Sequence, residues 1–194
     1  CVAGKAGTPC ENCLAGRFRS SSDSQAEICN PCGVGKFQKN VGQGSCLPCI
    51  PGEYNDQTTG VTQCKPCAAN SFNGEQQREE NCVNCPAGWS SEEGSTKCQS
   101  CEAGMYSNEV GVACGNCVIG MYRQSKESDS TGTFLTDKIT DPTKCVNCPA
   151  GWESSEVGST QCLSCEAGKF SDSQGAACVV CASGKYRQSK ESDG

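Results

Sequence analysis

The chain reads CVNCPAGWSSEEGSTKCQSCEAGMY from Cys82 to Tyr106 and CVNCPAGWESSEVGSTQCLSCEAGKF from Cys145 to Phe170. Both stretches contain paired cysteines, a glycine with an aromatic residue after each pair, and a polar segment before the next pair. They contain almost nothing that could catalyse a reaction. A sequence motif of this kind that is repeated 63 residues later indicates the building block of a repetitive scaffold.

The CxxC motif continues along the whole chain and accounts for every cysteine except Cys1. Its ten copies begin at residues 10, 29, 46, 64, 82, 98, 114, 145, 162 and 178. Ten of the eleven aromatic residues lie four or five positions after the second cysteine of a pair, and only Phe134 lies outside this pattern. The polar segments are rich in Asn, Asp, Ser and Gly, which are typical of tight turns.

These features predict a repeat that consists of CxxG with its aromatic residue, a short strand, a polar turn, a second short strand and the next cysteine. A two-stranded hairpin of this size is marginal by itself in water, so the repeats need cross-links. The predicted fold class is therefore small disulfide-rich repeats that form an elongated rod of short β-hairpins, with little or no helix. We expect one aromatic ring per repeat to build a thin core along the rod.

The repeats predict four domains. Residues 1–12 form a truncated repeat, and residues 13–81 hold four cysteine-rich repeats. Residues 82–144 form a three-unit super-repeat with a long hairpin insert at 123–144, and residues 145–194 form its second copy, truncated at the C-terminus. Both copies end on YRQSKESD, so we expect text similar to TGTFLTDKITDPTKC to follow Gly194.

The composition favours an extracellular or cell-surface location. With 21 cysteines in 194 residues and no histidine, the chain has the composition of a disulfide scaffold from an oxidising compartment. A net charge of −6 argues against nucleic acid as a partner. No run of 18 apolar residues occurs, so no membrane span is expected, and the start at Cys1 indicates an excerpt from a secreted precursor.

The register of the motifs favours bridges from the second cysteine of each pair to the first cysteine of the next. The expected disulfides are Cys1–Cys10, Cys13–Cys29, Cys32–Cys46, Cys49–Cys64, Cys67–Cys82, Cys85–Cys98, Cys101–Cys114, Cys117–Cys145, Cys148–Cys162 and Cys165–Cys178. Cys181 is left over and would pair beyond Gly194. Interleaved pairing, first to third and second to fourth, remains the alternative.

Other chemistry for these cysteines is less consistent with the pattern. Two neighbouring CxxC motifs have the spacing of a four-cysteine zinc ribbon. Zinc sites, however, need motifs that are grouped in separate pairs, whereas these motifs are spaced regularly along the chain. A redox role usually needs one motif in a βαβ context. The acidic residues form no calcium-binding loop of the EF-hand kind. We therefore predict no metal and no cofactor.

The residue inventory also argues against an enzyme. There is no histidine and no GxSxG, so a Ser or Cys nucleophile would lack its usual base. No N-x-[ST] sequon occurs, which leaves serines and threonines of the turns as candidate sites for O-linked sugar.

The motif CxxCxxGx[YF], with a glycine before the next CxxC, resembles the ephrin-receptor-like cysteine-rich repeat. Each loop is also similar to the single-bridge module of tumour necrosis factor receptors. The resemblance covers Cys10 to Tyr186 and implies an extracellular elongated array with bridges of the Cys13–Cys29 type. The sequence departs from the pattern at Asn70, which replaces the glycine, and in CPAGWS and CPAGWE, which put the aromatic residue one place early.

Two functions fit this architecture. The first is a structural extracellular repeat protein that associates with itself in a filament, surface coat or polymer like a flagellar hair, because a periodic surface favours periodic contacts. The alternative is a receptor or adhesion ectodomain that binds a protein ligand. Within the first, we expect lateral contact through the segment 128–143, with Phe134, Leu135 and Ile139, or else through exposed Trp89 and Trp152.

Overall fold

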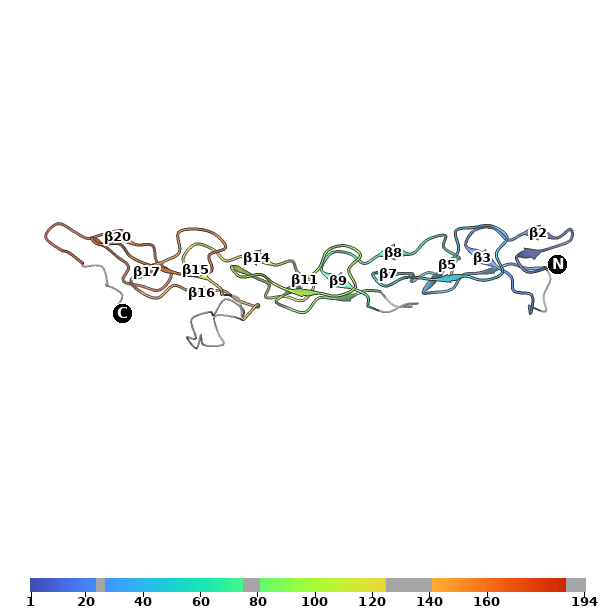
Figure 1. The fold of residues 1–194 in the computed structure, drawn as a ribbon, viewed down its shortest axis with the longest axis horizontal. Coiled ribbons are helices and arrows are strands. Elements are labelled where there is room, and N and C mark those ends of the chain that lie inside the picture. Colours follow the sequence, from blue (N-terminus) through green and yellow to red (C-terminus); the bar gives the residue numbers. More distant parts are fainter. Residues whose placement is uncertain (24–26, 75–80, 125–140, 188–194) are drawn as a thin grey trace. The chain divides into compact units, whose positions relative to one another are not determined.

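The computed structural model describes residues 1–23, 27–74, 81–124 and 141–187. These residues contain twenty strands, each two residues long, and no helix (Figure 1). Accordingly, no helix that is long and apolar enough to cross a bilayer occurs in the described ranges. The predicted class of small disulfide-rich β-hairpin repeats is confirmed.

Consecutive strands pair antiparallel into ten separate two-stranded sheets. The pairs are β1 (Lys5–Ala6) with β2 (Glu11–Asn12), β3 (Arg17–Phe18) with β4 (Asn30–Pro31), β5 (Lys36–Phe37) with β6 (Leu47–Pro48), β7 (Glu53–Tyr54) with β8 (Lys65–Pro66), β9 (Ser71–Phe72) with β10 (Val83–Asn84), β11 (Trp89–Ser90) with β12 (Gln99–Ser100), β13 (Met105–Tyr106) with β14 (Gly115–Asn116), β15 (Met121–Tyr122) with β16 (Val146–Asn147), β17 (Trp152–Glu153) with β18 (Leu163–Ser164), and β19 (Lys169–Phe170) with β20 (Val179–Val180). We call each hairpin, together with the disulfide that closes it, a module.

The strands do not lie where the sequence predicted them. The first strand of a hairpin holds the two residues after the glycine, and the second holds the two residues inside the next CxxC motif. Gly16, at φ 82°, reverses the chain, so that Arg17 and Phe18 run back beside the next motif. The amide of Cys32 donates to the Gly16 carbonyl at 2.8 Å, which fixes this pairing. The polar segment is therefore the loop between the strands.

The modules are grouped into two compact units. The first comprises Cys1–Cys85 with Ser91–Cys98, and the second comprises Pro86–Ser90 with Gln99–Gly194. Within each unit, hydrogen bonds connect each module to the next, and glycines contact the loops of modules further along the chain.

The predicted core of aromatic rings is wrong for the described residues. Their buried side chains are mainly cystines and polar groups, and the rings of Phe18, Phe37, Tyr54, Phe72, Tyr106 and Tyr122 are only half-buried. Phe170 is 37% exposed and Tyr186 is 83% exposed. Strands of two residues are too short to enclose a ring.

Candidate functional site

Nine of the ten disulfides join the second cysteine of a CxxC motif to the first cysteine of the next, and the tenth joins Cys1 to the first motif; this is the pairing that the register favours over interleaved bridges. They are Cys1–Cys10, Cys13–Cys29, Cys32–Cys46, Cys49–Cys64, Cys67–Cys82, Cys85–Cys98, Cys101–Cys114, Cys117–Cys145, Cys148–Cys162 and Cys165–Cys178. Their Cα atoms lie 5.5 to 5.8 Å apart, which is ordinary disulfide geometry. Cys181 is a half-buried free thiol.

Two backbone hydrogen bonds recur at the junction between modules. Within a module, the second cysteine of the motif donates to the carbonyl of the turn glycine, as Cys117 does to Gly104 at 2.7 Å. Between modules, the amide of that glycine donates to a carbonyl of the following module, as Gly104 does to Arg123 at 2.8 Å. Each bond occurs ten times, so module stacking is largely a property of the main chain.

Glycine is favoured at these turns by a positive φ, and at several of them also by a close approach between modules. A Cβ atom on Gly104 would lie 2.0 Å from the carbonyl oxygen of Gly158, which belongs to the loop of a later module. A Cβ atom on Gly16 would lie 2.0 Å from the Gly60 carbonyl oxygen in the same way. Asn70, which replaces glycine in one module, adopts φ 63° and keeps both junction bonds at 2.8 Å. The turn geometry is therefore the same at this exception.

A buried or half-buried polar residue lies three positions after Asn70 and after each turn glycine from Gly16 to Gly184, and we call it the junction residue. The junction residues are Arg19, Gln38, Asn55, Asn73, Ser91, Ser107, Arg123, Ser154, Ser171 and Arg187. Eight of them are at most 7% exposed, and Ser91 and Arg187 are half-buried. Sequence reasoning missed this site, although its signal was present, since a polar residue follows the aromatic residue in every repeat.

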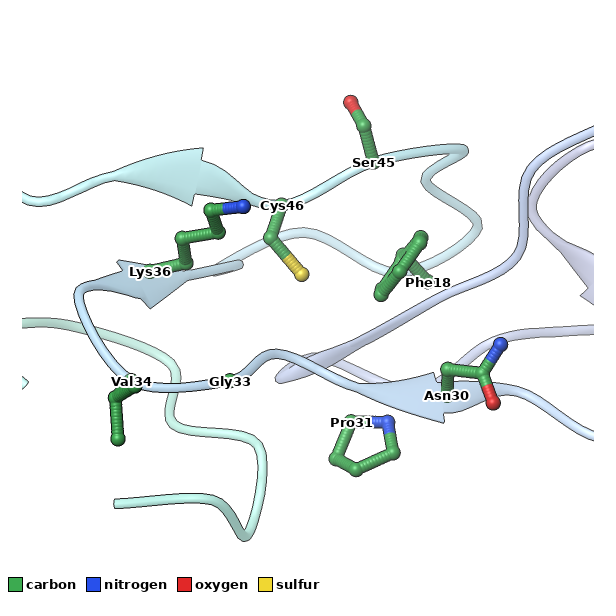
Figure 2. A pocket seen from close by; sticks show the side chains of 8 residues that line it. All are labelled: Phe18, Asn30, Pro31, Gly33, Val34, Lys36, Ser45 and Cys46. Atoms are coloured by element: carbon green, nitrogen blue, oxygen red, sulfur yellow. The ribbon is translucent and has the colours of Figure 1, made fainter. Parts of the chain in front are cut away.

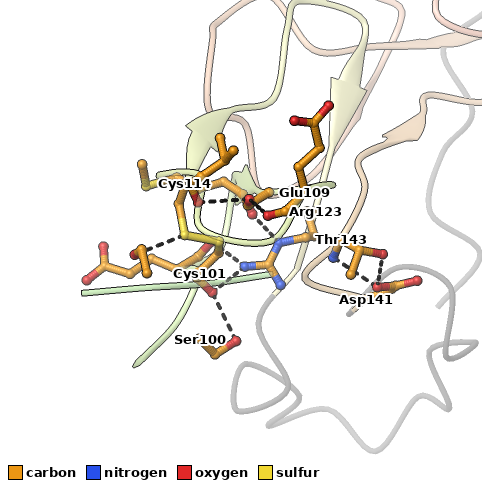
Figure 3. Close-up of a disulfide and its surroundings, with 12 residues drawn as sticks. Ser100, Cys101, Glu109, Cys114, Arg123, Asp141 and Thr143 are labelled. Carbon is orange, nitrogen blue, oxygen red and sulfur yellow. Dashed lines mark hydrogen bonds between the residues drawn. A yellow bond between two sulfur atoms is a disulfide. The ribbon is translucent and has the colours of Figure 1, made fainter. Parts of the chain in front are cut away.

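Arg123 shows what a long junction side chain does (Figure 3). Its guanidinium donates to the carbonyls of Cys101, Glu102 and Met105, which form the turn of the preceding module. Burial lowers the pKa of Arg123, and the nearby negative charge of Asp141 opposes this shift. A buried cation needs such partners, because desolvation without hydrogen bonds would be costly.

Arg19 repeats this arrangement at the start of the chain. Its Nη1 atom donates to the carbonyls of Cys1, Val2 and Lys5 at 2.9, 3.2 and 3.2 Å. The turn thus presents carbonyl oxygens that converge on one donor. The shorter side chain of Asn55 makes the same kind of contact, with the carbonyls of Gly33 and Lys36.

Other junction residues turn to the loop of their own module. The Ser107 hydroxyl donates to the carbonyls of Glu109 and Val112, at 3.1 and 3.0 Å. The Ser171 hydroxyl donates to those of Ser173 and Ala176, at 3.0 and 3.1 Å. Gln38 does the same toward the Ser45 carbonyl at 2.8 Å. The junction position therefore holds a hydrogen-bonding side chain in every case, but its length does not decide which module it contacts, because the Ser91 and Ser154 hydroxyls donate to Ser71 and Met121 of the preceding modules.

The module with the long insert uses a different loop residue at its junction. The amide of the junction residue Ser107 donates to the Pro142 carbonyl at 3.1 Å. At the next junction, the amide of Arg123 donates to the carbonyl of the loop residue Ser159. Asp141 accepts hydrogen bonds from the hydroxyl and amide of Thr143, which lower the pKa of this carboxyl group to about 2. The base of the insert is therefore held in the same place as an ordinary loop. The predicted hairpin tip, with Phe134, Leu135 and Ile139, lies outside the described residues.

Trp89 and Trp152 occupy an outward position on the surface. Each is the first residue of its strand, where other modules have Lys5, Arg17 or Lys36, whereas other aromatic residues take the second place. Both tryptophans are 39% exposed, and both face a small serine across the hairpin, Ser100 and Ser164. Once per super-repeat, the chain thus places a tryptophan at the first strand position instead of an aromatic residue at the second.

A groove lies beside the Cys32–Cys46 disulfide, where the ends of two hairpins meet (Figure 2). Its lining residues are Phe18, Asn30, Pro31, Gly33, Val34, Lys36, Ser45 and Cys46. Phe18, Pro31 and Val34 contribute apolar surface, Asn30 and Ser45 contribute polar groups, and Lys36 lies on one side beside Cys46. The groove is therefore of mixed polarity with one cationic side chain on its edge.

The described residues contain no group of three or more His, Cys, Asp or Glu side chains that could hold a metal ion. Disulfide-rich hairpin folds of this kind are typically non-enzymatic.

Residues 20–63 match the sequence model of the tyrosine-protein kinase ephrin type A/B receptor-like family. No curated protein matches the chain. The matched segment contains the same CxxGx(aromatic) motif, disulfide register and hairpins as the modules outside it. Together with the ten disulfides, the match points to an extracellular or cell-surface location. The chain is therefore an array of cysteine-rich hairpin repeats, of which residues 20–63 are similar to the ephrin-receptor-like family.

Proposed function

We propose that the chain is a structural segment of an extracellular filament, surface coat or polymer like a flagellar hair, and that its partner is a further copy of itself. The observation that carries this proposal is the equal exposure of Trp89 and Trp152, at corresponding places of two super-repeats that both begin with CVNCPAGW and share YRQSKESD. An exposed aromatic side chain that recurs at a fixed interval offers the same contact repeatedly, as a polymer requires.

The interior of the modules supports the same proposal. The residues that recur in every module are cystines, turn glycines and junction residues, and these bind other parts of the same chain. They hold each module on its neighbours within a unit. The tryptophans take no part in these junction bonds, so their recurrence needs another reason.

Electron microscopy of native material in negative stain tests the proposal. Long, regular fibres or sheets are expected. Dispersed single particles at all protein concentrations would contradict self-association and would favour the alternative, a receptor or adhesion ectodomain that binds a protein ligand.

A double substitution links the assembly to the tryptophans. We expect Trp89→Ala with Trp152→Ala to reduce assembly at least tenfold, measured by analytical ultracentrifugation, because buried tryptophans are typical hot spots of interfaces. The matched control is Met105→Ala with Met121→Ala, at the same strand position in neighbouring modules, where the side chains are half-buried. Equal losses from both double variants would contradict a specific role of the tryptophans.

A further inference from the structure

The groove in the first compact unit has the properties of a docking site for an aromatic side chain with a nearby acid. Phe18 and Val34 are half-buried, and Pro31 is exposed, so three apolar side chains border one hollow. Lys36 is exposed and supplies the positive charge on its flank (Figure 2). Pockets that combine apolar surface with a few placed polar groups are typical binding sites.

The two tryptophan hairpins carry the complementary features. Trp152 is followed by Glu153 and Glu156, and Trp89 by Glu92 and Glu93. The carboxylate of Glu153 accepts a hydrogen bond from the Cys178 amide at 2.8 Å, so it is engaged within the chain. Glu156 is exposed. A tryptophan hairpin thus presents an exposed ring with an exposed acid four residues later.

Charge is also distributed unevenly along the chain. The first 50 residues hold five Lys/Arg against three Asp/Glu, whereas the remaining residues hold 11 against 19. The part of the chain with the groove is therefore positive, and the part with the tryptophans is negative. Opposite charges on two surfaces favour their encounter and fix their register.

We propose that this groove binds the tryptophan hairpin of a second copy of the chain. The ring of Trp152 or Trp89 packs on Phe18 and Pro31, and an acid of the same hairpin pairs with Lys36. Because donor and acceptor surfaces differ, the contact is heterologous, and a rotation between copies that does not close a ring would let it add copies without limit. This inference rests on the proposed self-association and names the surfaces that carry it.

Intrinsic fluorescence tests the inference, since Trp89 and Trp152 are the two tryptophans of the chain. The disulfide-intact protein is diluted through its assembly range while sedimentation and tryptophan emission are recorded. We expect the emission to move to shorter wavelength as copies assemble, because rings leave water. Lys36→Glu should weaken assembly about tenfold or more, and Glu93→Lys with Glu156→Lys should do the same.

Two further variants make the test specific. Lys39→Glu places the same charge change on an exposed lysine of the same module that does not line the groove, and it should leave assembly within about twofold. Combining Lys36→Glu with the two Glu→Lys changes should restore part of the assembly. Equal effects of Lys36→Glu and Lys39→Glu, or assembly without a change in emission, would overturn the groove contact while self-association stands. Absence of assembly in the unmodified protein would overturn both.

Discussion

The modules closed by Cys117–Cys145 and by Cys165–Cys178 solve the same packing problem with different side chains. In both, the junction residue accepts the bond from the preceding turn glycine at 2.8 Å, Gly104 to Arg123 and Gly151 to Ser171. Arg123 then extends into the preceding module, whereas the Ser171 hydroxyl returns to its own loop. The main chain therefore provides the stacking common to all modules, and the side chain adjusts how firmly two neighbours are joined.

The largest expected loss of stability comes from disturbing the main-chain contacts between modules. Gly104→Ala puts a methyl group where the Gly158 carbonyl lies, and Ala at φ +76 is strained as well, so we expect a loss of about 3 kcal/mol or more. Gly168→Ala is the control, because its Cβ would meet nothing within 4 Å at a similar φ of +79. That variant should cost about 1–2 kcal/mol.

Hydrogen exchange of the Arg123 and Gly158 amides measures this difference, since both donate across the junctions that Gly104→Ala would open. Equal loss of protection in the two glycine variants would show that backbone strain alone matters. The close approach between modules would then have no energetic role.

A smaller loss of stability is expected when the side chain of a junction residue is removed. Arg123→Ala leaves the turn carbonyls of Cys101, Glu102 and Met105 without their donor, which should cost about 2–3 kcal/mol. Ser171→Ala removes one hydroxyl within a loop and should cost about 1 kcal/mol. Protection of the Gly104 amide reports the first change, and protection of the Gly151 amide reports the second. A Ser171 variant as destabilised as the Arg123 variant would remove the distinction between the two modules.

The smallest effect concerns acid. Asp141 has a folded pKa of about 2 against an ordinary value of 3.8, so it stabilises the fold above about pH 4 and loses this contribution as pH falls toward 2. The Asp141→Asn variant should be less stable than the unmodified protein at neutral pH. The difference between their free energies of unfolding, here called the gap, should narrow between pH 4 and pH 2. Denaturant unfolding at several pH values measures the gap. A gap that does not change with pH would show that the charge of Asp141 contributes nothing.

The sequence predicted the hairpin repeat correctly, because cysteine spacing, turn glycines and polar loops are all local signals. Nine of the ten disulfides lie between neighbouring motifs, so register alone identified the favoured partners. Exposure of Trp89 and Trp152 could also be expected from their shifted place after the glycine.

Strand positions and the interior could not be predicted in the same way. The second strand lies inside CxxC, where two residues are too few to show any alternation of apolar and polar side chains. The junction residues form a polar interior, which hydrophobicity patterns do not reveal. Arg123 was not recognised because its partners are main-chain carbonyls of Cys101, Glu102 and Met105, and these carry no signature in the side-chain sequence.

The locality of the bridges has a consequence for biosynthesis. The ten disulfides close loops with sequence separations of 9 to 28 residues, so each can form as soon as the next motif enters an oxidising compartment. The bond of a turn glycine to the next module, such as Gly104 to Arg123, and its contact with a later loop, such as Gly104 with Gly158, must wait for further chain. During export, only the newest modules still lack their disulfides, while the earlier modules are already oxidised. Adding modules therefore lengthens the product without making its maturation slower at any one step.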